Sequence, residues 1–179
     1  MDLKEWGWDD AWDKVLDQSE SPSRNVARVT SQNRDRWDVQ TQSGAAIARI
    51  PTAWAGDLFP VVGDWVLLEP GPAPSDPWTI VDVLPRRSRF SRGSAGSGSE
   101  EQVLAANVDR VWIVHGLDIL PNPRRLERYL AVTWQSGASP EIILTKSDLA
   151  EDLDAAIATV ASIALGAPIR VIKIGRAHV

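Results

Sequence analysis

The residues of this sequence best suited to chemistry are Thr145, Lys146 and Asp148, which directly follow the apolar run 142–144. A carboxylate at Asp148 can accept hydrogen bonds from the N1–H group and the exocyclic amine of guanine, whereas adenine presents no such pair of donors. The aliphatic stem of Lys146 can cover a face of the base while its ammonium group stays hydrated. Ligands of open α/β sheets bind beyond the carboxyl ends of the strands, so the position also suits a nucleotide. A simpler interpretation stays open, in which Asp148 only caps an exposed helix.

A second candidate site is a run of four arginines within seven residues, Arg86, Arg87, Arg89 and Arg92. Guanidinium groups bind phosphate oxygens, and such contacts add affinity for nucleic acid without reading its sequence. The run therefore indicates a surface for RNA, although a turn whose arginines are only solvated would have the same sequence.

The sequence lacks the groups that phosphoryl transfer requires. Gly93, Gly96 and Gly98 have the spacing of a phosphate-binding loop, but no lysine follows them to reach the phosphates. No Asp-x-x-Gly segment is present for a magnesium ion, so we expect neither a catalytic residue nor a metal site in this chain. His115 ends an apolar run, and we expect it to pack at a strand end rather than to act as a general base.

An alternation of strands and helices must position the first candidate site. The apolar run 108–115 predicts a strand that is buried on both faces. Asn122, as an N-cap before Pro123, is typical of a helix start, and Gly137 is typical of its end. The apolar stripe of this helix is expected to comprise Leu126, Leu130 and Trp134. Strands and helices are expected to alternate over 108–115, 124–135, 142–144, 148–164 and 169–172, which implies a parallel sheet.

Five short runs of alternating apolar and polar residues precede this region, with turn residues between them. They span residues 25–30, 37–41, 45–50, 64–69 and 78–84. Such a set predicts a small antiparallel barrel. We expect an OB-fold, whose open face commonly binds oligonucleotides, although an SH3-like barrel would have a similar sequence. Trp37 or Trp65 would then lie beside the arginine run on an RNA-binding face.

The composition is that of a globular protein, since 44% of the 179 residues are hydrophobic and 24% are charged. Residues 1–20 contain seven acidic and two basic side chains, so the net charge of −5 does not exclude a nucleic-acid surface further along the chain. Trp6, Trp8 and Trp12 in this segment are expected to pack on the following domain, or alternatively to dock a partner. The absence of cysteine excludes disulfides and thiolate metal sites. No apolar run is long enough to span a membrane, and we expect a cytoplasmic protein.

Five blocks of sequence follow one another in an order that is specific to a known family. They are Gly63–Val66, Leu84–Arg87, Gln102–Asp109, Arg125–Ala131 and Leu144–Leu149. With these blocks the chain resembles the ribosome small-subunit-dependent GTPase A family from residue 6 to about residue 172.

The resemblance implies an OB-fold followed by an α/β, P-loop-type GTPase domain that is circularly permuted, so that its guanine-specificity motif precedes its phosphate-binding loop. Thr145, Lys146 and Asp148 match that motif, with Thr145 where many GTPases have asparagine. It also implies GTP or GDP with Mg²⁺ as ligands, and a zinc ion in a C-terminal domain that this chain lacks. The implied partners are the small ribosomal subunit and its rRNA. The implied activity is GTP hydrolysis, stimulated by that subunit, in its late maturation by a monomeric protein.

We divide the chain accordingly. The expected parts are an acidic segment over 1–24, the barrel over 25–91, a flexible junction over 92–106, the first part of the GTPase domain over 107–173, and residues 174–179. The last six residues would be encoded by ATC GGA AGA GCA CAC GTC, which resembles a sequencing adapter, and we expect them to be read-through. A chain that stops before its P-loop is expected to be inactive alone. The alternative function is a non-enzymatic OB-fold module that binds RNA.

Overall fold

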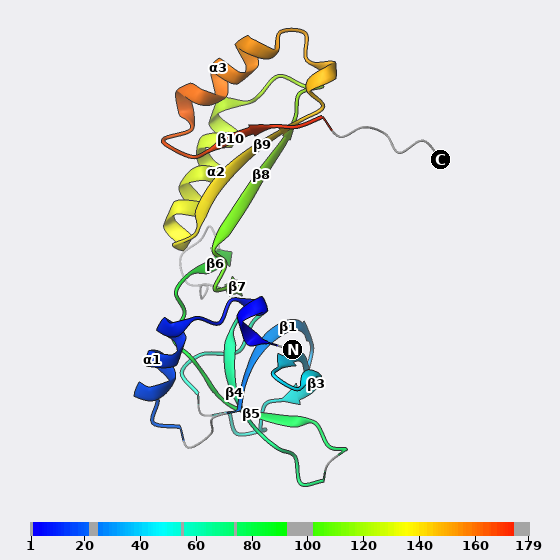
Figure 1. Cartoon of the computed structure of the whole chain (residues 1–179), viewed down its shortest axis with the longest axis vertical. Helices are drawn as coiled ribbons and strands as arrows, with labels where there is room; N and C mark the ends of the chain where they lie inside the picture. The colour runs from blue at the N-terminus through cyan, green and yellow to red at the C-terminus, as the bar shows by residue number, and fades with distance from the viewer. Residues whose placement is uncertain (1, 22–24, 55, 74, 93–101, 174–179) are drawn as a thin grey trace, which may run out of the picture. The chain divides into compact units, whose positions relative to one another are not determined.

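The computed structural model describes residues 2–21, 25–54, 56–73, 75–92 and 102–173 (Figure 1). The chain divides into two compact units, Met1–Asn107 and Val108–Val179. The barrel forms most of the first unit, and the parallel sheet forms the second.

Five strands of the first unit close into a barrel. They are β1 (Asn25–Asn33), β2 (Arg36–Thr41), β3 (Gly44–Arg49), β4 (Trp65–Glu69) and β5 (Trp78–Val83). Their order around the barrel is β1-β2-β3-β5-β4, with β3 and β5 parallel and the other pairs antiparallel. This order is that of an OB-fold rather than an SH3-like barrel, so the predicted fold is confirmed.

Strand β4 contributes to two hydrophobic cores because its side chains alternate between the two faces of the sheet. Val66 and Leu68 belong to the barrel interior, and Trp65 and Leu67 belong to a second core. The prediction that Trp37 or Trp65 lies on an exposed RNA-binding face is wrong, since both side chains are 0% exposed. The alternation that identified these strands also directs both indole rings into a core.

The acidic N-terminal segment covers the second core. It contains a 3-10 turn, η1 (Leu3–Trp6), and the helix α1 (Asp10–Gln18). Trp12 is buried against Trp65, and Trp8 meets the same ring edge-on at 4.8 Å between centroids. The predicted packing of this segment on the following domain is therefore confirmed for Trp8 and Trp12, whereas Trp6 is 36% exposed and lies outside this core.

A two-stranded sheet follows the barrel within the first unit. It pairs β6 (Arg89–Arg92) with β7 (Gln102–Ala106) in antiparallel orientation. The prediction of a flexible junction over 92–106 is therefore wrong for Arg92 and for 102–106. Residues 102–106 pair with β6, and the amide of Ala106 also donates to the carbonyl oxygen of Val62 at 2.9 Å. The predicted glycine-rich stretch from Gly93 to Gly98 lies outside the described residues.

The second unit is a three-stranded parallel sheet in the order β10-β9-β8. Its elements are β8 (Arg110–Gly116), α2 (Pro123–Ser136), β9 (Ser139–Thr145), the 3-10 turn η2 (Ser147–Leu149), α3 (Leu153–Ile163) and β10 (Ile169–Val171). Asn122 caps α2 by accepting the amide of Arg125 at 3.1 Å, and Gly137 ends it with φ of 88°. The predicted alternation of strands and helices and the predicted caps are confirmed.

One face of this sheet is open. Ile113 packs in the core with both α2 and α3, which lie on the same side of the sheet (Figure 1). On the opposite face, Trp112 is 68% and Val114 is 62% exposed, so the prediction of a strand buried on both faces is wrong for β8. Trp134 is also exposed, and Thr133 is buried in its place. Two turns of an α-helix take about 7.2 residues. Thr133, seven residues after Leu126, therefore lies closer to the same stripe than Trp134, which is eight residues after it.

Candidate functional site

The guanine-type motif lies where β9 ends. Thr145 is the last residue of the strand, and Asp148 lies in η2. Helix α3 begins only at Leu153, and its N-cap is Asp152, whose carboxylate accepts the amide of Ala155 at 2.9 Å. The helix predicted from residue 148 is therefore wrong at its start, and so is the interpretation of Asp148 as its cap. Asp148 is exposed and forms no hydrogen bond or ion pair with the described residues, which leaves its carboxylate available to a ligand.

Lys146 is held in an unusual backbone conformation at the turn after β9. Its φ of 56° lies in the left-handed region, which residues other than glycine rarely adopt. The ammonium group pairs with the carboxylate of Asp118, and its stem runs close to Gly116, where an added Cβ would lie 3.4 Å from Cδ of Lys146. The same Cβ would meet Oδ1 of Asp118 at 2.6 Å, so a larger residue at position 116 would displace the carboxylate that pairs with Lys146.

Thr145 connects the ends of the two strands. Its side chain is 8% exposed, and its hydroxyl donates to the carbonyl oxygen of His115 at 3.3 Å. The backbone amide of Leu117 donates to the carbonyl oxygen of Thr145 at 2.9 Å. The hydroxyl is thus used to join β8 and β9, which places Lys146 at a defined point on the edge of the sheet.

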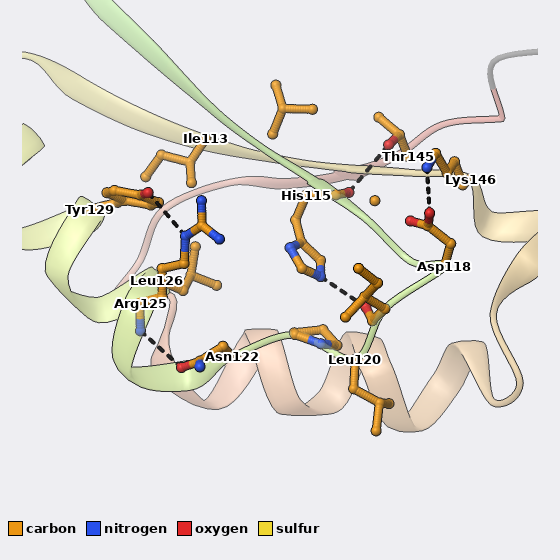
Figure 2. A pocket seen from close by; sticks show the side chains of 14 residues that line it. Ile113, His115, Asp118, Leu120, Asn122, Arg125, Leu126, Tyr129, Thr145 and Lys146 are labelled. Atoms are coloured by element: carbon orange, nitrogen blue, oxygen red, sulfur yellow. Dashed lines mark hydrogen bonds and ion pairs between the residues drawn. The ribbon is translucent and has the colours of Figure 1, made fainter.

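A cavity of about 560 Å³ lies beside these residues, at the carboxyl ends of β8 and β9 and the start of α2 (Figure 2). Thr145 and Lys146 line it, whereas Asp148 does not. His115 lies between the Lys146–Asp118 pair and a second polar pair from α2. With its proton on Nε2, His115 donates to the carbonyl oxygen of Ile119 at 3.0 Å. This contact agrees with the expected role of His115 as a packed strand-end residue.

The second polar pair in the cavity is Arg125 with Tyr129. Nε of Arg125 donates to the phenolic oxygen at 3.0 Å. This hydrogen bond and the guanidinium charge lower the pKa of Tyr129, because they stabilise its phenolate. The sequence prediction missed Asp118, Arg125 and Tyr129. The signal for the last two was the run of arginines at the start of the predicted helix.

We expect the pKa of Asp118 to lie below its usual range and to rise toward that range in Lys146→Met. The hydrogen bond from the Lys146 ammonium is the largest cause, and its charge adds to the effect. Because the pKa of Asp118 is lower in the folded chain, the Lys146–Asp118 pair stabilises the fold fully at pH values above the usual carboxyl pKa. This stabilisation is lost as the pH falls through the pKa of the folded chain. NMR titration of the side-chain carboxyl carbon measures this, with Lys173→Met as the control. An unchanged pKa in Lys146→Met would contradict the assignment.

The predicted arginine surface is largely committed to internal contacts. Arg86 donates from Nε and Nη2 to the two carboxylate oxygens of Asp64 at 2.8 and 2.7 Å, and Nη2 also donates to the carbonyl oxygen of Phe59. The side chains of Arg86 and Asp64 are only 9% and 0% exposed. The prediction that Arg86 meets RNA phosphates is therefore wrong, because the fold uses it to neutralise a buried carboxylate.

Arg87 also has an internal acidic partner, but at the surface. Its two terminal nitrogens donate to the carboxylate of Asp9 at 2.7 Å each, and its guanidinium lies 4.0 Å from the ring centroid of Trp12. This pairing holds the pKa of Asp9 well below its usual range. Arg89 is exposed on β6, whereas the side chain of Arg92 lies outside the described part of the chain.

Neither a metal-binding cluster nor a membrane-spanning helix is found among the described residues. Within 2–21, 25–54, 56–73, 75–92 and 102–173, no three His, Asp or Glu side chains gather to hold a metal ion. These ranges therefore offer no three-ligand cluster for a zinc ion, and no chemical step is assigned to zinc or magnesium. No helix in the same ranges is long and apolar enough to cross a membrane.

Comparison with known proteins gives one consistent family. Residues 83–178 match the family model described as RsgA GTPase. The chain is 37% identical over 154 residues to the small ribosomal subunit biogenesis GTPase RsgA of Streptomyces coelicolor, which covers 84% of this chain and 41% of that protein. It is 40% identical over 149 residues to RsgA 1 of Oceanobacillus iheyensis, with 80% and 42% covered. The chain thus spans less than half the length of these curated relatives.

A solved structure supports the fold. YjeQ from Thermotoga maritima superimposes with a TM-score of 0.64 and 19% sequence identity, over 83% of this chain and 51% of that chain. The likeness agrees with a barrel followed by part of an α/β domain.

Proposed function

The chain belongs to the RsgA GTPase family, and on that premise we propose that Thr145, Lys146 and Asp148 form the guanine-binding part of a GTPase. The relatives are named for biogenesis of the small ribosomal subunit. We propose that this chain takes part in the same process, with the subunit and its rRNA as partners in the cytoplasm.

The free carboxylate of Asp148 is the observation that carries this proposal. It is exposed beyond the carboxyl end of β9, and no described side chain or backbone group engages it. In the proposed complex it accepts the N1–H and exocyclic N–H groups of guanine. The stem of Lys146 covers the base, and Asp118 is a positioning residue that holds its ammonium group. Thr145 anchors the turn through its bond to the backbone of His115.

We assign base recognition to this chain and not phosphoryl transfer. The 179 residues contain neither a G-x-x-x-x-G-K-[ST] segment nor an Asp-x-x-Gly segment. Preorganised positive groups around the phosphates supply most of the catalysis in such enzymes. We therefore propose that the chain binds GDP or GTP weakly and does not hydrolyse GTP alone.

Asp148→Ala is expected to weaken GDP binding by at least about 100-fold. Two hydrogen bonds to a charged acceptor are lost, and each contributes about 1.5–3 kcal/mol. Asp148→Asn is expected to lose GDP but to gain xanthosine diphosphate, because its amide can donate to the C2 carbonyl of xanthine. Chemical-shift titration up to millimolar nucleotide measures both changes.

Asp154→Asn is the matched control, since it removes an exposed carboxylate at the start of α3. It is expected to leave the affinity for GDP unchanged. The proposal fails if the wild-type chain shows no saturable shifts with GDP. It also fails if Asp148→Asn and Asp154→Asn bind GDP equally well.

We also propose that the first unit contacts rRNA. Of the side chains predicted to bind RNA, only Arg87 and Arg89 remain candidates within the described part of the chain. Arg87 is half exposed, and an RNA phosphate can replace the carboxylate of Asp9 as its bidentate acceptor. A non-enzymatic RNA-binding role is the alternative for this chain, and loss of the guanine proposal above would favour it.

A further inference from the structure

The first two turns of α2 carry positive charge that the described residues do not neutralise. Arg124, Arg125 and Arg128 are exposed there, and none forms an ion pair within the described part of the chain. Glu127 lies between them but does not pair with them. The first helical turn contains no acidic residue, so the partial positive charge of the helix N-terminus adds to that of the guanidinium groups.

Four other arginines of the described chain differ from these three, because each has a carboxylate partner within 4 Å. The pairs are Arg36–Asp38, Arg86–Asp64, Arg87–Asp9 and Arg170–Glu141. The start of α3 has the opposite charge, with Glu151, Asp152 and Asp154 in succession around its N-terminus. The charge at the start of α2 is therefore a local feature of one helix and not a property of the whole unit.

Tyr129 holds two of the arginines together. The guanidinium carbon of Arg125 lies 5.4 Å from the ring centroid, and that of Arg128 lies 5.8 Å from it. The ring is 39% exposed. The hydrogen bond from Arg125 Nε to the phenolic oxygen leaves the two terminal nitrogens of that guanidinium to bind an external acceptor. A rigid helix thus presents neighbouring fork-shaped donors, which suit bidentate binding of phosphate oxygens.

We propose that Arg124, Arg125, Arg128 and Tyr129, the α2 basic surface, bind the phosphate backbone of small-subunit rRNA. The choice of RNA rests on the proposed function, and the charge and geometry of the surface supply the binding chemistry. Phosphate contacts of this kind add affinity without base specificity. Arg125 and Tyr129 line the cavity that Thr145 and Lys146 also line, whereas Arg124 and Arg128 do not. Arg124 and Arg128 can therefore be replaced without changing that lining.

The test compares the whole chain with Arg124→Gln/Arg128→Gln in filter binding of a small-subunit rRNA transcript at several salt concentrations. Each lost phosphate contact lowers the salt slope by about 0.7–0.9, so the double variant is expected to lower it by about 1.4–1.8. When the salt rises from 50 to 200 mM, the factor by which the affinity falls is then expected to be about tenfold smaller for the variant than for the wild type. Arg124→Lys/Arg128→Lys keeps both charges and is expected to keep the wild-type slope.

Two further measurements separate this proposal from the others. The helical circular dichroism of Arg124→Gln/Arg128→Gln and its response to GDP are expected to match the wild type, which shows an intact second unit. Arg87→Gln/Arg89→Gln tests the barrel contact independently. If only this second variant changes the slope, RNA binds the first unit alone, and the α2 proposal is overturned.

Two other outcomes also overturn it. One is a wild-type chain that does not bind the transcript at 50 mM salt, which leaves the GDP experiment as an independent test of guanine binding. The other is an α2 variant that binds naked rRNA normally but whole small subunits more weakly, which identifies an acidic protein surface as the partner. A reduced slope with Gln that is restored with Lys supports the phosphate contact.

Discussion

Arg86→Ala is expected to lower the free energy of unfolding of the first unit by about 3–5 kcal/mol. The variant leaves the fully buried carboxylate of Asp64 without its cation, and an unpaired buried charge is strongly destabilising. The carbonyl oxygen of Phe59 also loses its donor. Urea unfolding followed by tryptophan fluorescence measures the change, because the buried rings of Trp37 and Trp65 report on this unit.

Two comparisons make this result specific to burial. Arg36→Ala removes an arginine from a partly exposed pair with Asp38, at 49% and 35% side-chain exposure, and is expected to cost about 0–1 kcal/mol. Arg86→Met/Asp64→Asn removes both charges and keeps an oxygen for the amide of Val61, so it is expected to cost less than the two single variants together. Equal losses for Arg86→Ala and Arg36→Ala would contradict the importance of the buried pair.

Trp65→Ala is expected to lower the free energy of unfolding of the first unit by about 3–5 kcal/mol, because it opens a cavity between the barrel and the N-terminal segment. The side chain is 0% exposed and contacts the rings of Trp8 and Trp12. Its indole nitrogen has no hydrogen-bond partner among the described residues, so its contribution comes from packing and from the Arg28 guanidinium, which lies 5.2 Å from the ring centroid. We expect the amides of α1 to lose protection from hydrogen exchange in this variant before those of β2.

Trp6→Ala is the control for the loss of an indole ring from the same unit. Trp6 is 36% exposed, and its backbone carbonyl oxygen, which accepts from Arg28, is retained in the variant. A cost well below that of Trp65→Ala is expected. Similar costs, or unchanged exchange of the α1 amides in Trp65→Ala, would show that the second core does not hold the segment in place.

Local signals in the sequence were sufficient for the five barrel strands and for the alternating strands and helices of the second unit. Alternation of apolar and polar residues marked all five barrel strands, because one face of each strand must be buried. Asn122, Pro123 and Gly137 marked the ends of α2, since each satisfies a backbone requirement within a few residues of itself. Local signals were misleading where two turns stood close together, so α3 was predicted to begin at Asp148 instead of Leu153.

For the candidate sites too, some features followed from the local sequence and others only from the tertiary structure. The sequence determined that Thr145, Lys146 and Asp148 follow a strand end, because the motif and its strand are contiguous. Only the tertiary structure decided that Arg86 belongs to Asp64, 22 residues away, and that Arg87 belongs to Asp9, 78 residues away.

The sequence by itself therefore determined the barrel strands, the strands and helices of the parallel sheet, and the type of each candidate group, but not β6 and β7. The tertiary structure decided which of these groups a ligand can reach. An arginine has the same local sequence signature whether it is solvated or paired. Whether a ligand can reach it depends on whether the folded chain brings a carboxylate next to it. Arg86 is paired with a buried carboxylate, whereas Arg128 is exposed.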